Sequence, residues 1–186
     1  MTRGRARLLA PLVPGALLTL VALAVLAAPA PPAAPAADGH ADDLIAFRLK
    51  NQYENLITDA RYRGAPLVVS WADRNGSDHL DAWLPALRDT LVTELRGHRL
   101  RILDVADVAG VPFFIKGLVR SRMQESASGS VLLDWGGAFR KAYGCTPDHV
   151  NLILFDGESR LVAIYALAEY DSTLHAEVLT GIRGLL

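Results

Sequence analysis

The architecture of this chain follows from residues 67–80, which read LVVSWADRNGSDHL. The run Leu67–Trp71 comes after a Gly-Ala-Pro turn signal and is apolar apart from one serine, as is typical of a buried strand. Asn75-Gly76-Ser77 breaks the strand, and leucines at helical spacing then continue from Leu80 to Leu95. This order, a buried strand that turns into a helix, is the repeating unit of an alternating α/β fold.

The segment Leu80–Leu95 is expected to form one helix. Ser77 is placed to cap it, and Asp78 lies in its first turn, where the helix dipole favours an acid. Pro85 should kink the helix, because proline donates no backbone hydrogen bond and its ring clashes with the preceding turn.

Further elements follow on both sides of this unit. An apolar helix face is expected from Phe113, Phe114, Leu118 and Met123 after Pro112, and Ser172 is placed to cap a last helix. A short helix is expected at 138–143, and strands are expected at 47–49 (a possible edge strand), 100–105, 131–134, 150–155 and 161–166, the last two joined by a hairpin turn at 156–159. This order predicts a central mixed sheet with helices on both faces.

The first 37 residues have the three parts of a secretory leader. Arg3, Arg5 and Arg7 form a basic start, residues 8–37 carry no charge, and Ala34-Pro35-Ala36 offers a cleavage site. We expect cleavage after Ala36, which divides the chain into a leader at 1–36, a linker at 37–46 and a domain at 47–186. The alternative is an uncleaved membrane anchor with the proline- and alanine-rich stretch as a tether.

Charge and cysteine content argue against a nucleic-acid-binding protein and against a domain held by disulfides. The formal net charge is −1, and removal of three arginines with the leader takes it to −4, which argues against nucleic-acid binding. The one cysteine, Cys145, leaves no internal disulfide, so packing must hold the exported domain.

The order of elements and the motifs at 67–72, 131–134, 142–144 and 152–157 resemble the thioredoxin fold, particularly its redoxin and peroxiredoxin-like branch. The resemblance covers nearly all of residues 47–186 and implies an α/β/α sandwich of three layers around a mixed sheet. The chain also resembles the exported thioredoxin-like proteins of the YtfJ type, which share the leader, a cysteine-free turn after the first core strand and an Asp-containing loop, here Asp104–Pro112.

The resemblance locates a redox site from which the sulfurs are missing. Redox-active members carry Cys-x-x-Cys at a helix N-terminus, where the dipole stabilises a thiolate. Counting from Trp71-Ala72 puts Asn75 and Asp78 at the two cysteine positions, and counting from Pro85 puts Ser77 and Leu80 there. The family's cis-proline position falls on Val150. Ordinary dithiol–disulfide exchange is therefore not expected.

Cys145 admits two interpretations. One is a solitary thiol, activated by His149, that acts as a peroxidase or mixed-disulfide partner. The other is a small buried apolar residue, because free cysteine is among the most buried residue types and the family usually has Val or Ile at this position.

The polar run Asp73, Arg74, Asn75, Ser77, Asp78 and His79 lies where the family has its active site. It is interpreted either as a binding surface for a protein or small ligand of the cell envelope, or as a solvated helix start. No metal site and no cofactor are predicted, because the carboxylates and His79 lie on one helical turn and no phosphate-binding motif is present. The sequence thus favours an exported, redox-inactive binding or accessory protein that would meet a membrane only through an uncleaved N-terminal segment; a one-cysteine enzyme and a purely structural envelope protein are the alternatives.

Overall fold

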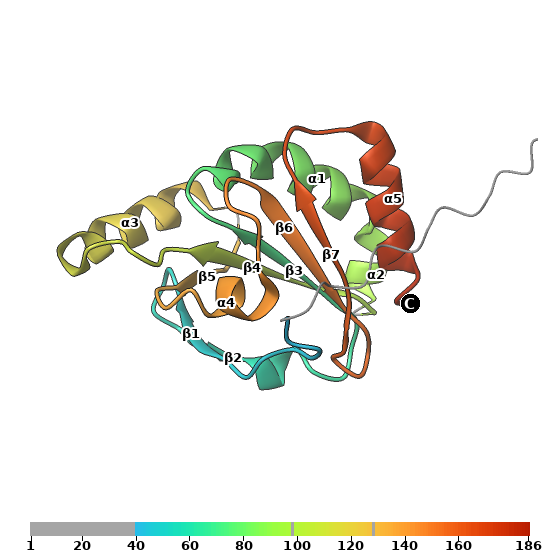
Figure 1. The fold of residues 1–186 in the computed structure, drawn as a ribbon, viewed down its shortest axis with the longest axis horizontal. Helices are drawn as coiled ribbons and strands as arrows, with labels where there is room; N and C mark the ends of the chain where they lie inside the picture. The colour runs from blue at the N-terminus through green and yellow to red at the C-terminus, as the bar shows by residue number, and fades with distance from the viewer. Residues whose placement is uncertain (1–39, 98, 128) are drawn as a thin grey trace, which may run out of the picture. The chain divides into compact units, whose positions relative to one another are not determined.

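The computed structural model describes residues 40–186 except residues 98 and 128. In this part of the chain seven strands form one mixed sheet with the order β2-β1-β5-β4-β3-β6-β7 (Figure 1). β3 is parallel to β4 and β4 to β5, whereas β6 is antiparallel to β3 and β7 to β6. The strands are β1 (Arg48–Asn51), β2 (Leu56–Thr58), β3 (Leu67–Ala72), β4 (Arg101–Asp107), β5 (Val131–Asp134), β6 (Val150–Phe155) and β7 (Leu161–Leu167).

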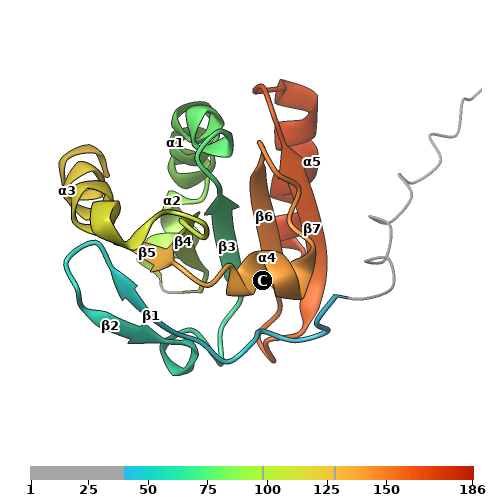
Figure 2. The same cartoon turned by 60° about the vertical axis from the view of Figure 1, so that its left-hand side comes forward.

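Helices cover both faces of the sheet, which confirms the predicted three-layer α/β/α sandwich (Figure 2). One face carries α1, α3 and α5, and the other carries α4. The helices are α1 (Leu80–Thr90), α2 (Val92–Arg96), α3 (Lys116–Ser126), α4 (Ala138–Tyr143) and α5 (Ser172–Arg183), with single turns of 3-10 helix, η1 to η3, at Asp59–Arg61, Gly76–His79 and Phe113–Ile115.

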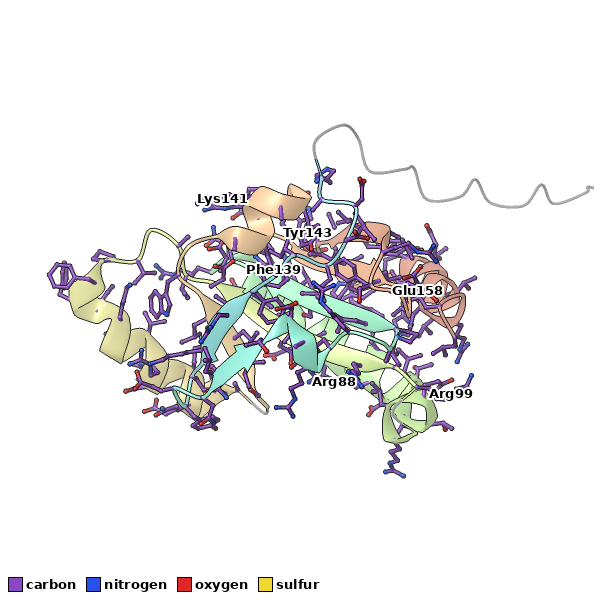
Figure 3. All side chains as sticks on the ribbon, turned by 90° about the horizontal axis from the view of Figure 1, so that it is seen from below. Arg88, Arg99, Phe139, Lys141, Tyr143 and Glu158 are labelled. Carbon is purple, nitrogen blue, oxygen red and sulfur yellow. The ribbon has the colours of Figure 1, made fainter. Side chains whose placement is uncertain are left out.

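Alternate residues of the central strands point to opposite faces of the sheet, and each face has its own main hydrophobic core. Trp71 of β3 packs with Phe139 and Tyr143 of α4 on one face, and all three are fully buried. Figure 3 shows both α4 aromatics directed toward the sheet and Lys141 directed away from it. Trp83 of α1 and Ile182 of α5 pack on the other face. Each large buried side chain contributes roughly 1.5–3 kcal/mol to folding.

The strand predicted at 47–49 is not at the edge of the sheet. β1 pairs with β5 on one side and with the unpredicted β2 on the other, so β2 forms the edge. The side chain of Asn51 accepts the backbone N–H groups of Tyr53 and Asn55 at 3.0 and 2.9 Å, and Glu54 has φ of 66°. These contacts close a tight β1–β2 turn that hydrophobic periodicity does not reveal.

Two predicted helix caps and one predicted helix length were wrong. The helix at 80–95 breaks at the buried Leu91 into α1 and α2, with Pro85 inside α1. Ser77 lies in η2 and donates its hydroxyl to the carbonyl of Arg74 rather than capping α1. Asp171, not Ser172, caps α5, because its carboxylate accepts the N–H of Leu174 at 2.7 Å.

The predicted apolar face after Pro112 is mostly at the surface. Phe113, Phe114 and Leu118 are 83, 74 and 60 % exposed, and only Met123 of that set packs on the core. These side chains stay exposed because α3 packs only on a small cluster built around Ala106, Val108 and Leu133.

The described part of the predicted linker, residues 40–46, packs on the domain. Leu44 is 2 % exposed and its N–H donates to Ser159 O at 2.8 Å, while Leu161 N donates to Asp42 O at 2.7 Å. Contacts with the domain therefore begin before residue 47. The predictions about the leader fall on residues 1–39, outside the described residues. Across residues 40–186, with 98 and 128 left aside, no helix is both long and apolar enough to span a membrane.

Candidate functional site

The β3–α1 turn, residues 73–79, is organised by one carboxylate. Asp73 Oδ1 accepts the N–H of Gly76 at 2.8 Å, and Asp73 Oδ2 accepts the N–H of Asp148 at 3.0 Å. Arg74 and Asp78 are exposed and His79 is half-buried. Asp73 therefore shapes the turn and attaches it to a segment that is distant in the sequence, whereas the other charged side chains are left at the surface.

The α4–β6 loop, residues 144–149, faces this turn. Asn151 is fully buried, and its side chain accepts the N–H of Thr146 at 2.8 Å and donates to the Thr146 carbonyl at 2.9 Å. Asn75 Nδ2 donates to Asp148 Oδ1 at 2.7 Å. A Cβ on Gly76 would lie 2.3 Å from the His149 carbonyl oxygen, so the two backbones are in direct contact.

The structure thus brings together several of the positions singled out in the sequence. Val150 lies opposite Ala72 in the β3–β6 ladder and is fully buried, so the expected cis-proline position does adjoin the turn. Asn75 occupies one expected cysteine position, and its amide is bonded to the loop. Asp78, at the second position, is exposed, and in the alternative register Ser77 bonds within the turn.

Cys145 lies beneath the loop, against α4. Cys145 is 4 % exposed, and its Sγ lies 3.8 Å from the Phe139 carbonyl oxygen, its single hydrogen-bond partner among the described residues. Burial raises the pKa of the thiol to about 12, and the carboxylates of Asp107 and Asp134 add to the effect. His149 Nδ1 is 2.7 Å from the Pro147 carbonyl, and no hydrogen bond joins it to Cys145 among the described residues.

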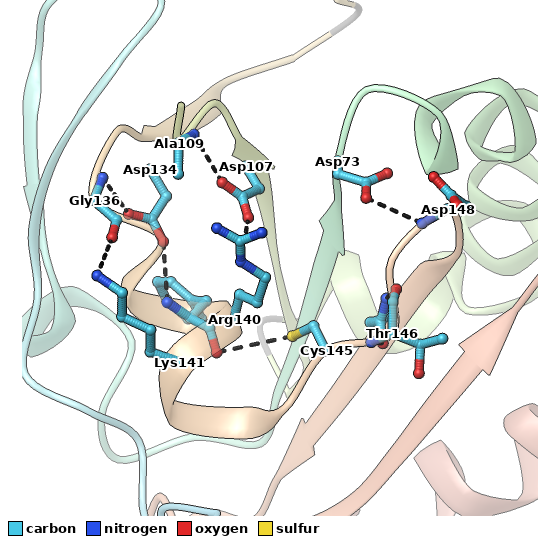
Figure 4. A network of polar contacts seen from close by, with 12 residues as sticks. Asp73, Asp107, Ala109, Asp134, Gly136, Arg140, Lys141, Cys145, Thr146 and Asp148 are labelled. Atoms are coloured by element: carbon cyan, nitrogen blue, oxygen red, sulfur yellow. Dashed lines mark hydrogen bonds and ion pairs between the residues drawn. The ribbon is translucent and has the colours of Figure 1, made fainter. Parts of the chain in front are cut away.

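A pair of carboxylates beside Cys145 was not singled out in the sequence (Figure 4). Asp134 is fully buried and accepts the N–H of Phe139 at 3.0 Å, so it anchors the start of α4. Arg140 Nε lies 3.2 Å from Asp107 Oδ2, an ion pair without hydrogen-bond geometry. Burial raises the pKa of Asp107, against the opposing effects of the Ala109 N–H and Arg140. The sequence signal that could have revealed this pair is an aspartate at the carboxyl end of each of two neighbouring strands, Asp107 in β4 and Asp134 in β5.

The segment Asp104–Pro112, interpreted above as a loop, begins inside β4. Its first four residues pair with β5, with Asp107 opposite Asp134. In the described residues, no group of three or more His, Cys, Asp or Glu is placed to hold a metal ion.

Comparison with known proteins identifies the fold. No family model matches the sequence, and no curated protein sequence matches it significantly. Among solved structures, the chain is similar to the pneumococcal exposed lipoprotein thioredoxin Etrx1 of Streptococcus pneumoniae, with a TM-score of 0.60, 18 % identity, and coverage of 76 % of this chain and 100 % of that one.

Two further structures show the same likeness. A secreted disulfide oxidoreductase of Mycobacterium tuberculosis, homologous to E. coli DsbE, has a TM-score of 0.53 and 15 % identity, covering 75 % of this chain and 96 % of that one. A thiol:disulfide interchange protein of the thioredoxin family from Chlorobium tepidum has a TM-score of 0.55 and 11 % identity, covering 85 and 99 %. The described domain has the thioredoxin-like fold, and it has it without a Cys-x-x-Cys motif. The closer likeness to YtfJ-type proteins stays a prediction.

Proposed function

We propose that this protein is an exported thioredoxin-fold protein that performs no dithiol–disulfide exchange and instead binds a protein or small ligand in the periplasm or cell envelope. The observation that carries the proposal is the composition of the site. Asn75 and Asp78 stand where two sulfurs would be needed, and the single thiol, Cys145, is buried.

The chemistry of thiol exchange requires an accessible thiolate. A thiol with a pKa of about 12 is almost wholly protonated at neutral pH, and its burial keeps a disulfide substrate away from the sulfur. A rigid, polar turn joined to the α4–β6 loop supports binding instead, because hydrogen bonds already hold its backbone in one conformation.

Export is supported by the leader pattern and by neighbours that are described as exposed or secreted. Sequencing the N-terminus of the protein from an expressing cell tests this part, and a mature chain that starts at Ala37 is the expected result. A chain that keeps residues 1–36 in the membrane fraction would favour the anchored form.

An insulin-reduction assay tests the absence of redox activity. The wild-type mature protein should not accelerate insulin reduction by dithiothreitol, whereas the double variant Asn75→Cys, Asp78→Cys should gain measurable activity. This variant is the matched positive control, because it restores the two sulfurs on the same scaffold. Activity of the wild-type protein alone would overturn the proposal.

Thiol labelling tests the alternative, a one-cysteine enzyme. Cys145 should resist a disulfide reagent in the native protein and react stoichiometrically after denaturation. Rapid labelling of the native protein, lost in Cys145→Ser, would favour the enzyme instead.

A further inference from the structure

A cavity of about 490 Å³ lies between α1 and α3, above strands β3, β4 and β5. Both helices lie on the same face of the sheet (Figures 1 and 2). The helices contribute apolar side chains to the cavity wall, Leu84 and Pro85 from α1 and Val119 and Met123 from α3, whereas charged and hydroxyl side chains make up other parts of the lining. The volume is in the range of about 300–1,000 Å³ typical of small-molecule sites.

Among the described residues that line this cavity, three carry a buried side-chain oxygen without a hydrogen-bond partner. One of the three, Asp107 Oδ2, has an ion pair with Arg140, and the other two belong to neighbouring strands. Ser70 of β3 is 2 % exposed, and its hydroxyl has no hydrogen-bond partner among the described residues. Asp104 is its neighbour in the parallel β3–β4 ladder, and Asp104 Oδ1 is likewise buried and unpartnered. A buried polar group without a partner costs about 1–3 kcal/mol. Two such atoms side by side at one cavity therefore indicate a ligand group that bonds to both.

The charges around the cavity restrict that ligand. The other oxygen of Asp104, Oδ2, is paired with Arg88 at 2.5 Å. The Asp104 carboxylate therefore already has a cationic partner, and its Oδ1 does not. Burial raises the pKa of Asp104, against the lowering effect of Arg88. The lining carries four aspartates, at positions 73, 81, 104 and 107, against two arginines, at 74 and 88. This excess of acids disfavours an anion.

We propose that this cavity binds a small aliphatic molecule whose end group donates hydrogen bonds, an alcohol or a primary amine. The end group donates to Asp104 Oδ1 and bonds to the Ser70 hydroxyl, which can both donate and accept, and the aliphatic part lies against α1 and α3. The cavity borders the β3–α1 turn, which contributes Asp73, Arg74 and Ser77 to its lining. The assignment of this ligand rests on Ser70 and Asp104, however, and does not require that the turn bind a partner.

Titration of the isotope-labelled domain, residues 37–186, with 1-hexanol, hexylamine and hexanoate tests this assignment by amide chemical shifts. The alcohol and the amine should give saturable shifts at cavity-lining residues, and hexanoate should bind at least tenfold more weakly. Val119→Phe fills the cavity from α3 and should abolish the shifts, whereas Leu118→Phe, its neighbour on the exposed side of α3, should leave them unchanged.

Ser70→Ala provides a variant with little effect on shape and should weaken 1-hexanol binding about tenfold. The proposal is overturned if neither 1-hexanol nor hexylamine saturates, if hexanoate binds as tightly as the other two probes, or if Ser70→Ala binds 1-hexanol as the wild type does. An inactive result in the insulin assay has no bearing on any of these outcomes.

Discussion

Replacing Gly76 by alanine should destabilise the domain, because the turn and the loop leave no room for a side chain there. The new Cβ would lie 2.3, 2.7 and 2.9 Å from the O, C and N atoms of His149, all of them backbone atoms. Real Cβ atoms essentially never approach other heavy atoms within 3.0 Å, so one of the two segments must move. That movement would strain the hydrogen bonds from Asp148 N to Asp73 and from Asn75 to Asp148.

The expected size follows from the cost of overpacking. Inserting a methyl group into a tightly packed region costs about 1–3 kcal/mol, which lowers the melting temperature of a domain of this size by roughly 3–10 °C. Gly117→Ala is the matched control, since it makes the same chemical change in α3 with no heavy atom within 4 Å of the new Cβ. It should stabilise by about 0.4–1 kcal/mol, because alanine loses less backbone entropy on folding.

Urea and thermal unfolding of the two variants give the measurement. Opposite signs are the expected result, with the denaturant slope unchanged in both. If Gly76→Ala is as stable as the wild-type protein, the turn and the loop are not in contact as described, and the assignment of these two segments to one site fails.

Three other outcomes follow from buried polar groups. Asp134→Ala should cost roughly 1–3 kcal/mol in chemical unfolding, because it leaves the N–H of Phe139 unpaired at the buried start of α4; an unchanged unfolding midpoint would contradict this. The Cys145 thiol keeps its proton up to pH of about 12 in the folded state, while the unfolded thiol loses it near its ordinary value. Folding stability should therefore decrease between about pH 9 and 12, and more steeply in the wild type than in Cys145→Ala; parallel pH profiles would count against it. Arg88→Met removes the partner of Asp104, so it should destabilise by roughly 1–3 kcal/mol at pH 7. The loss should become smaller as the pH falls, because burial raises the pKa of Asp104 and a protonated carboxyl group no longer needs a cation; a loss that does not change with pH would show that the ion pair is not the cause.

The strands of the central sheet could be predicted from local signals. Leu67–Trp71 and Val150–Phe155 are runs that are apolar apart from one residue each, Ser70 and Asn151, and both form strands in which every residue is buried. The hairpin turn at 156–159 likewise depends on residues next to one another. β2 was missed because three half-exposed residues carry no periodic pattern, and Phe113 was misassigned because hydrophobicity does not say whether a neighbouring element arrives to cover it.

In the candidate site, too, the identities of the residues could be predicted from the sequence, whereas their contacts with distant segments could not. The lack of sulfur at Asn75 and Asp78 is covalent, so it can be read from the order of residues once Trp71-Ala72 marks the end of the strand. The bond from Asn75 to Asp148 joins residues 73 positions apart, and no local pattern predicts such a contact. It depends on β6 pairing with β3, which sets Val150 opposite Ala72.

The properties of the chain thus fall into two groups with different origins. Its single cysteine and its missing redox motif are consequences of composition and spacing alone. The depth of Cys145, the ion pair of Asp104 and the cavity between α1 and α3 depend on which elements become neighbours when the sheet forms. The physical reason is that burial, which raises the pKa of a thiol or a carboxyl group, is a property of the surroundings that distant segments supply.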